Sequence, residues 1–332
     1  MKKESDCTIS VVSQNVSCDT HSQKLESALG KEFSFRNRIT KTIENIVRLK
    51  PDVIALNEIR LSNNVEYTEK KMIENGYTAF NFANNPHDLA FRNIIAISNK
   101  QKEWKLISKE HKWLNVNERN QPCLSTELKL IEGDSHGRCV GLLYLQHTSK
   151  KKVCVAVTHV VPFGKVKYLQ QQAMMSVNLE NLQQAPPIPT IIAGDLNRFW
   201  DESDVFDQHL EKYKLQELNP TELVIKYGTT EMKYLKGDVG TFTPWPVDSV
   251  LYNDTSYMKN PMEKSRLDVQ LCTTSTSSMD LISIIRAEVH ASMLLSPNTN
   301  AEPNPNIDKV RQILDKTMSS DHLAILGVYK CF

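Results

Sequence analysis

Short runs of apolar residues recur along this chain, separated by longer segments that are apolar on one side only. A continuous apolar run bounded by Pro or Gly is typical of a strand that is covered on both faces. Residues 8–17 instead alternate between apolar and polar positions, which also predicts a strand. We therefore expect strands over residues 8–17, 52–59, 93–98, 140–145, 153–158, 191–193, 266–271, 281–290 and 323–329.

Three longer segments have the character of helices that are apolar on one face. Pro51 ends the first of them, because proline cannot continue a helix, and Gly76 caps the second. Helices and strands thus follow one another along the chain, as in α/β domains. The expected helices cover residues 36–50, 66–75 and 166–183.

Composition narrows the class of protein without identifying it. The 332 residues include 40 Lys and Arg against 39 Asp and Glu, so the formal net charge is +1. A chain with so little net charge has no overall attraction for nucleic acid, and a local patch has to bind any polyanion. The seven cysteines are scattered and form no Cys-x-x-Cys pair, which favours a reducing compartment over a disulfide framework.

We expect a single domain over residues 8–332, preceded by a tail at residues 1–7, because no repeat or change of composition marks another boundary. Residues 296–306 hold three prolines and four asparagines and are expected to form a flexible insertion. The N-terminus lacks the apolar core of a signal peptide, and no stretch of about eighteen apolar residues occurs. These features predict a soluble intracellular protein, cytoplasmic or nuclear, without a transmembrane segment.

Polar side chains stand at the ends of most of the expected strands. Strand ends of one α/β sheet converge in space, and ligands bind there. Gly194 would let the backbone turn or approach another group closely. Glu58 ends a buried strand, where an unpaired carboxylate is costly, so Arg60, another residue or a metal has to neutralise it. The polar set comprises Asn15, Glu58, His159, Asp195, Asn197, Asp268, Asp321 and His322.

Taken in order, these residues resemble the signature blocks of the endonuclease/exonuclease/phosphatase superfamily, which includes deoxyribonuclease I. The resemblance spans residues 9–329. It implies a four-layered α/β sandwich, in which two central mixed sheets are flanked by helices and the active site lies at one edge. It also implies Mg²⁺-dependent hydrolysis of phosphoester bonds, with Mn²⁺ able to substitute. The blocks are Asn15, Pro51-Asp52 with Glu58, Thr158-His159, Gly194-Asp195-Leu196-Asn197, Arg266-Leu267-Asp268 and Ser320-Asp321-His322.

The resemblance implies a metal site centred on Glu58. Mg²⁺ takes oxygen ligands and is usually bound by one or two carboxylates. Asn15 and Asp321 would complete or support this site through an oxygen atom or a bound water. The residue before Glu58 is Asn57, where relatives usually carry Gln, so the contacts behind the metal ligand are expected to differ.

The same resemblance assigns the hydrolytic step to five residues. Asp268 would hold one ring nitrogen of His322, which fixes the tautomer and raises the basicity of the imidazole. Either His322 or Asp195 would activate the attacking water, and the sequence leaves both assignments open. His159 and Asn197 would donate to phosphoryl oxygens as negative charge grows in the transition state.

The substrate is the least constrained part of the prediction, because branches of the superfamily share the site and differ in their loops. We expect a nuclease or nucleic-acid-end phosphodiesterase that acts on DNA or RNA. Arg60 would bind this substrate, while Phe242 and Trp245, in a loop rich in proline and aromatic residues, would stack on bases. The basic residues 100–113 would form either a phosphate-binding surface or the solvated side of an amphipathic strand.

Two alternatives from other classes stay open. A phospholipid or small-phosphoester hydrolase, resembling a sphingomyelinase or an inositol phosphatase, would need an apolar loop near the site, and residues 244–246 with Val250 and Leu251 are the candidate. A catalytically inactive binding module on the same fold is the other alternative. It is disfavoured because the acids, amides and histidines of the expected site are all present.

Overall fold

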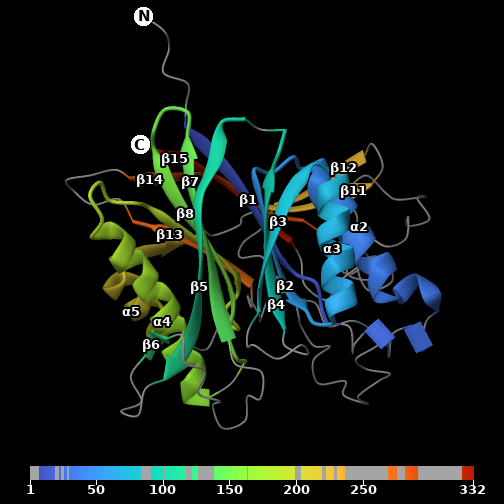
Figure 1. Cartoon of the computed structure of the whole chain (residues 1–332), viewed down its shortest axis with the longest axis horizontal. Helices are drawn as coiled ribbons and strands as arrows, with labels where there is room; N and C mark the ends of the chain where they lie inside the picture. The colour runs from blue at the N-terminus through green and yellow to red at the C-terminus, as the bar shows by residue number, and fades with distance from the viewer. Residues whose placement is uncertain are drawn as a thin grey trace, which may run out of the picture.

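The structure is a computed structural model of the chain (Figure 1). It describes residues 7–18, 22–23, 26–27, 30–83, 91–100, 102–116, 122–125, 138–162, 164–198, 203–218, 222–227, 230–235, 268–274, 281–290 and 324–332. Residues 1–6 of the expected tail and the expected insertion at residues 296–306 lie outside the described part.

Two mixed β-sheets form the centre of the protein. Their strands are β1 (Thr8–Asn15), β2 (Val53–Ile59), β3 (Tyr77–Ala83), β4 (Arg92–Ser98), β5 (Trp104–Val116), β6 (Pro122–Ser125), β7 (Arg138–His147), β8 (Lys152–His159), β9 (Thr190–Asp195), β10 (Leu215–Glu217), β11 (Glu222–Tyr227), β12 (Thr230–Leu235), β13 (Asp268–Thr273), β14 (Ile282–His290) and β15 (Ala324–Cys331). The eight-stranded sheet has the order β12-β11-β14-β15-β1-β2-β4-β3, and the seven-stranded sheet has the order β10-β13-β9-β8-β7-β5-β6. β1 pairs in parallel with β2, and β8 pairs in parallel with β9.

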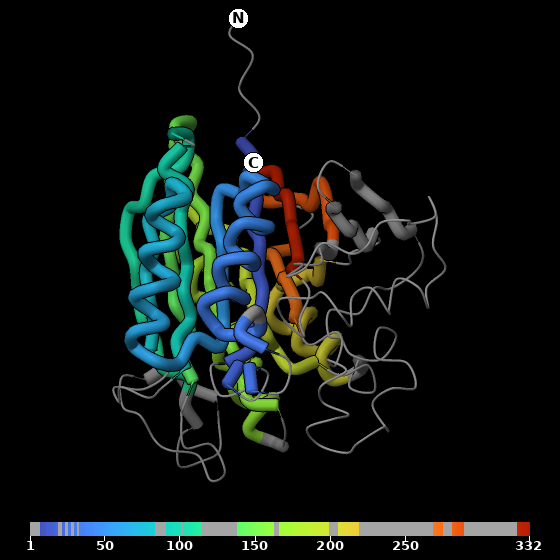
Figure 2. Tube along the Cα trace, turned by 90° about the vertical axis from the view of Figure 1, so that its right-hand side faces the viewer, coloured from blue at the N-terminus to red at the C-terminus, as the bar shows by residue number. Residues whose placement is uncertain are grey.

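Helices cover the outer face of each sheet (Figures 1 and 2). The helices α2 (Phe35–Arg48) and α3 (Ser62–Glu74) lie on the eight-stranded sheet, and a 3₁₀ helix, η1 (Lys31–Phe33), precedes α2. The helices α4 (Gly164–Leu182) and α5 (Ser203–Lys212) lie on the seven-stranded sheet. The result is the helix–sheet–sheet–helix sandwich that the sequence resemblance implied. No helix in the described ranges is long and apolar enough to cross a membrane.

Three apolar clusters make up the core, one between the two sheets and one beneath each pair of helices. In β2, Val53 and Ala55 belong to the cluster between the sheets, whereas Ile54 and Leu56 belong to the cluster beneath α2 and α3. Successive side chains of a strand point to opposite faces. A strand that is covered on both sides therefore needs apolar residues at successive positions, which accounts for the continuous apolar runs in the sequence.

The strands and helices expected from apolar patterning are present, including the hairpin of β7 and β8. Five strands that lie at the edge of a sheet or beside an edge strand were not predicted, namely β3, β6, β10, β11 and β12, and the helix α5 was not predicted either. β3 shows why: Thr78 and Asn81 are exposed, Tyr77 and Phe82 are buried, and the positions between are half-buried. An edge strand with so irregular a burial pattern has no clear period in its sequence.

The strand ends that carry the polar residues lie at the opposite end of the sandwich from the start of β1. β1 and β15 are antiparallel neighbours, with Thr8 opposite Lys330. The start of β1 and the end of β15 therefore lie at one end of the sandwich (Figure 1). Asn15, the last residue of β1, lies at the opposite end, together with Ala324, the first residue of β15.

Candidate active site

Three neighbouring strands of the seven-stranded sheet bring His159, Asp195 and Asp268 side by side. His159 ends β8 and pairs in parallel register with Asp195 at the end of β9. Asp268, the first residue of β13, lies opposite Asp195 on the other side. All three residues are buried. Three of the residues predicted from strand ends therefore form one row across the sheet.

Asn15 connects this row with the other sheet. It ends β1 beside Asn57 of β2. Its amide nitrogen donates to Oδ2 of Asp195 at 2.9 Å, and its amide oxygen accepts the backbone N–H of Ser17 at 2.9 Å. Asn15 was expected to support a metal. The contact that the structure shows is with Asp195, whose carboxylate it orients.

A β-bulge at the end of β2 directs the Glu58 side chain. The pairing of β2 with β4 shifts between Leu56 and Ile59, and Glu58 has a φ of +66°. In regular alternation Glu58 would lie on the same face as Leu56, beneath the helices. Bulges re-aim side chains in this way, and the Glu58 carboxylate instead meets His159 of the opposite sheet.

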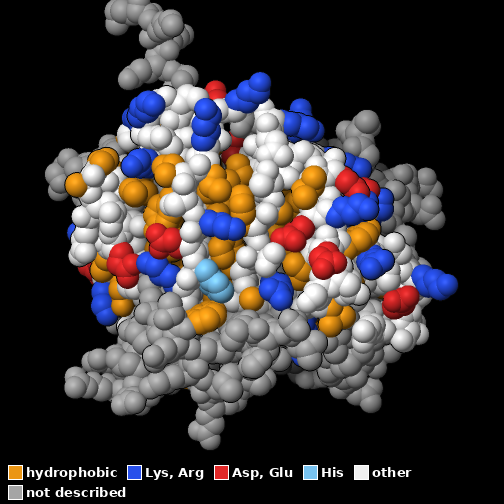
Figure 3. Space-filling view, viewed as in Figure 1, with side chains coloured by type: hydrophobic (Ala, Val, Ile, Leu, Met, Phe, Trp, Pro, Cys, Tyr) orange, Lys and Arg blue, Asp and Glu red, His pale blue; other side chains and the backbone are white. Residues whose placement is uncertain are grey.

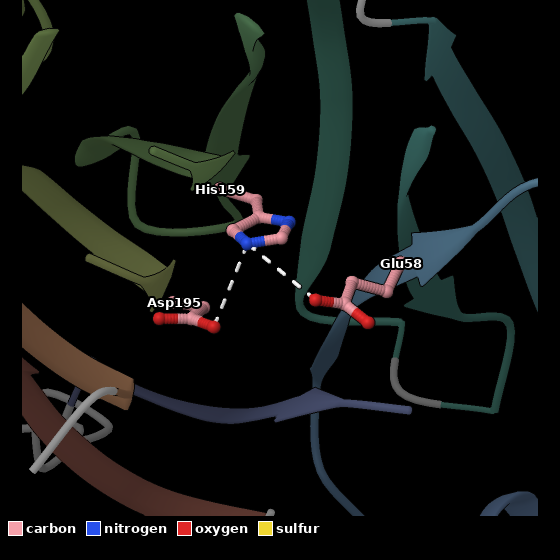
Figure 4. A group of neighbouring side chains, drawn as sticks. All are labelled: Glu58, His159 and Asp195. Carbon is pink, nitrogen blue, oxygen red and sulfur yellow. Dashed lines mark ion pairs between the residues drawn. The ribbon is translucent and has the colours of Figure 1, made fainter. Parts of the chain in front are cut away.

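Glu58, His159 and Asp195 form a cluster across the two sheets (Figure 4). Nε2 of His159 lies 3.6 Å from Oε1 of Glu58 and 3.6 Å from Oδ2 of Asp195. One ligand atom from each residue lies within 4.8 Å of the other two. The Glu58 side chain is 18% exposed, whereas those of His159 and Asp195 are 5% and 3% exposed. A ligand can therefore reach the cluster from the Glu58 side.

The loop after β9 is shaped around Asp195. Asn197 has a φ of +49°, its backbone N–H donates to Oδ1 of Asp195 at 2.8 Å, and its side-chain amide donates to the Val160 carbonyl at 2.8 Å. An amide group carries two N–H donors, so the second can serve a substrate oxygen. The two oxygens of Asp195 are thus held by Asn15 on one side and Asn197 on the other.

Gly194 permits the close approach of β8 and β9 at the site. Its φ is +144°, and a Cβ at this position would lie 2.0 Å from the Thr158 carbonyl oxygen. No side chain fits so close to a backbone oxygen. The glycine inferred from the sequence therefore has the role expected of it, a close backbone contact directly beside His159 and Asp195.

The cluster offers donors that suit a divalent cation. Glu58 and Asp195 supply carboxylate oxygens, which are the ligands that Mg²⁺ and Mn²⁺ prefer, whereas Asn15 turns its amide nitrogen toward Asp195. Glu58 is the most accessible of the three. The residues present therefore fit a hard divalent cation at Glu58.

An aromatic ring flanked by two arginines lies next to His159. The Phe91 ring meets the His159 ring edge-on at 6.1 Å. The guanidinium carbons of Arg60 and Arg138 lie 5.8 Å and 5.7 Å from the centre of the Phe91 ring. Arg60 was predicted at the site. Arg138 and Phe91 were missed, because each begins or precedes a strand with no motif around it, and only the strand pairing brings them to the site.

Four predicted site residues lie outside the described part of the chain: Asp321, His322, Phe242 and Trp245. The pairing of Asp268 with His322 and the stacking of aromatic rings on bases therefore stay predictions. Asp321 and His322 come shortly before β15 in the sequence, and β15 begins at Ala324.

The basic segment predicted around residues 100–113 is mostly the strand β5, and its side chains serve the fold. Trp104 and Trp113 donate to backbone carbonyls, and Lys112 pairs with Glu180 at 2.9 Å. Lys109 lies over the Phe80 ring. On the face shown in Figure 3, Lys and Arg side chains are interspersed with Asp and Glu. β5 thus matches the amphipathic strand better than a phosphate-binding surface.

Comparison with known proteins relates this arrangement to solved structures. No protein-family model and no curated protein matches the chain. In structure, the chain is similar to an endonuclease/exonuclease/phosphatase from Bacteroides vulgatus, with a TM-score of 0.64 and 12% sequence identity over 98% of this chain and 99% of that one.

Two further similar structures have more specific names. A mannosyl-6-phosphatase from Bacteroides thetaiotaomicron has a TM-score of 0.58 and 15% identity, covering 96% of this chain and 98% of that one. TDP2 from D. rerio, complexed with a single-stranded DNA product, has a TM-score of 0.55 and 14% identity, covering 98% and 100%. At such low identity the likeness shows the fold alone, and the fold is the one that the sequence resemblance implied.

Proposed function

We propose that this chain, which has the fold of the endonuclease/exonuclease/phosphatase superfamily, is a metal-dependent phosphoesterase. A fold by itself does not determine an activity, so the proposal rests on the site. The observation that carries it is the cluster of Glu58, His159 and Asp195 across the two sheets, with both contacts to His159 at 3.6 Å. Two carboxylates and an imidazole at a reachable edge are suited to metal-assisted hydrolysis.

In the proposed reaction the oxygen of a water molecule attacks phosphorus and the bond to the leaving oxygen breaks. The proton of the water passes to Asp195, whose two oxygens are oriented by Asn15 and Asn197, or to His322. His159, 3.6 Å from both carboxylates, is placed to donate a hydrogen bond to a phosphoryl oxygen.

Glu58 is the proposed metal ligand, with Asp195 as a nearby oxygen donor, Asn15 as a support through its bond to Asp195, and Asp321 as a further proposed member. Mg²⁺, or Mn²⁺ in its place, would supply positive charge to the phosphoryl group and to the leaving oxygen. Asp268 is proposed to act through His322, and its place opposite Asp195 keeps it within the row of site residues.

We propose a nucleic acid, DNA or RNA, as the substrate. Arg60 and Arg138 beside Phe91 put two cations and a ring next to His159. Guanidinium groups bind phosphates well, and rings stack on bases, so this flank suits a polynucleotide strand. The structural likeness to TDP2 with a single-stranded DNA product supports this choice. Phe242 and Trp245 are proposed as further stacking residues.

A small phosphoester is the second candidate, because a sugar phosphatase shares the fold at a similar level of likeness. The experiment that separates the two is a cleavage panel in Mg²⁺ with end-labelled single-stranded and duplex DNA and RNA, sphingomyelin and hexose phosphates. An Asp195→Asn variant excludes contaminating activity. A product ladder from nucleic acid supports the proposal, whereas release of phosphate or phosphocholine alone would replace the polynucleotide by a small substrate. No cleavage of any member would contradict the phosphoesterase.

A further inference from the structure

The two sheets meet mostly through apolar side chains, and the contact between Glu58 and His159 is one of several polar contacts that cross between them, as is the hydrogen bond from Asn15 to Asp195. Apolar packing is not directional. It therefore fixes the distance between two sheets more firmly than the position of one side chain against another. The cluster needs directional bonds to fix Glu58 against His159. Asn57, the residue before Glu58, makes such bonds.

Asn57 is fully buried and continues the inner face of β2. Its amide nitrogen donates to Oδ1 of Asn93 on β4 at 2.9 Å and to the carbonyl of Thr158 on β8 at 3.0 Å. The first bond holds the bulge against its own sheet, where β2 and β4 change register. The second crosses to the other sheet and ends on the residue before His159.

The partners of Asn57 are fixed in their turn. Asn93 donates to the carbonyl of Cys139 at 3.4 Å, and the Thr158 hydroxyl donates to the same carbonyl at 2.9 Å. The network therefore spans strands β2, β4, β7 and β8. Oδ1 of Asn57 has no hydrogen-bond partner among the described residues, so the donor bonds hold the network, and breaking one of them would leave a further buried polar group without its partner.

The space around Asn57 is matched to its length. A Cβ on residue 194 would lie 3.1 Å from Oδ1 of Asn57, besides its overlap with the Thr158 carbonyl. Gly194, Asn57 and Thr158 thus pack as one unit. A longer side chain at position 57 would have to move Thr158 or the bulge, since buried interiors have little free volume.

We propose that Asn57 is a positioning residue that locks the β2 bulge against β8 and thereby holds the Glu58 carboxylate within reach of His159. The proposal rests on the proposed function in so far as Glu58 and His159 are site residues. It adds that the Asn57 amide does this through its bonds to Asn93 and Thr158.

The test compares Asn57→Leu with Asn181→Leu. Asn181 is also buried and makes two side-chain hydrogen bonds, to Thr190 at 2.9 Å and from Tyr144 at 3.1 Å, at the far end of β9. Both variants lose buried amide bonds of the same kind, so their Tm values should fall by similar amounts. Only Asn57→Leu should weaken Mn²⁺ binding and kcat, by about 10–100-fold, as loss of support behind a metal ligand does.

A crystal structure of each variant measures the effect on the site independently of any enzymatic activity. The separation of Glu58 Oε1 and His159 Nε2 should exceed 3.6 Å in Asn57→Leu and stay at that value in Asn181→Leu. If Asn57→Leu does not fold, Asn93→Ala is measured in its place and should show the same effects.

Unchanged separation, Mn²⁺ affinity and kcat in Asn57→Leu, with a Tm like that of Asn181→Leu, would overturn the proposal and leave Asn57 a structural residue. A wild-type protein that hydrolyses no phosphoester would contradict the proposed function alone. The separation of Glu58 and His159 in the variants would still decide the role of Asn57.

Discussion

The amide nitrogen of Asn15 donates to Oδ2 of Asp195 at 2.9 Å, so the last residue of β1 orients the last residue of β9 across the two sheets. The other carboxylate oxygen accepts the backbone N–H of Asn197. The two hydrogen bonds thus hold the Asp195 carboxylate in one orientation. The proposed role of Asp195 in proton transfer requires a carboxylate at this position.

Asp195→Asn should lower turnover by about 10²–10⁴-fold, the usual contribution of a positioned acid or base. The variant keeps the size of the side chain, so its Tm should stay within a few degrees of wild type. Asp207→Asn is the matched control, since its carboxylate is 64% exposed on α5, and should keep wild-type kcat. Full activity in Asp195→Asn would remove Asp195 from the site.

Glu58→Gln should weaken Mn²⁺ binding by at least about tenfold, measured by electron paramagnetic resonance or calorimetry, because an amide is a poorer ligand for a hard cation than a carboxylate. Glu103→Gln is the control: its carboxylate pairs with His147 at 3.7 Å and is 59% exposed. Equal Mn²⁺ affinity in Glu58→Gln and wild type would place the metal elsewhere.

Gly194→Ala should lower the free energy of unfolding by at least about 3 kcal/mol, because the residue has a φ of +144° and its Cβ would overlap the Thr158 carbonyl. Gly76→Ala is the comparison. Its φ is +88°, but its Cβ would meet only the flexible end of Lys100, so a loss of about 1–2 kcal/mol is expected. Urea denaturation of both variants measures the difference. Equal losses would show that the contact of Gly194 with Thr158 is not tight in solution.

Burial raises the pKa of Asp52 above its ordinary value of 3.8, although Ser10 donates two hydrogen bonds to its carboxylate. A carboxyl group whose folded pKa is raised contributes stability below the unfolded pKa and loses that contribution as pH rises through the folded pKa. The free energy of unfolding of wild type minus that of Asp52→Asn should therefore fall between pH 4 and pH 7. A difference that does not vary over this range would contradict the shift.

The resemblance of the sequence to a known superfamily implied the sandwich, and the apolar runs marked most of its buried strands. Asn15, His159, Asp195 and Asp268 do converge where their strand ends were expected to meet. The orientation of Glu58 could not be predicted, since it depends on a bulge set by contacts between strands.

Site residues that only tertiary contacts bring together also could not be predicted from the sequence. Arg138 begins β7 of one sheet and Phe91 precedes β4 of the other, and the two side chains meet because the sheets pack together at the site. No local sequence pattern indicates such a contact. The edge strand β3 was missed for a related reason, because a half-exposed strand does not need a continuous apolar run.

The central claim is that this site hydrolyses a phosphoester with a divalent cation. The most direct test is the rate of cleavage of single-stranded DNA or RNA by the wild-type protein before EDTA treatment, after it, and after Mg²⁺ is added back. We predict that EDTA abolishes cleavage and that Mg²⁺ restores it. Cleavage that persists in EDTA would contradict a metal-dependent site, and so would a protein that cleaves no phosphoester with Mg²⁺ present.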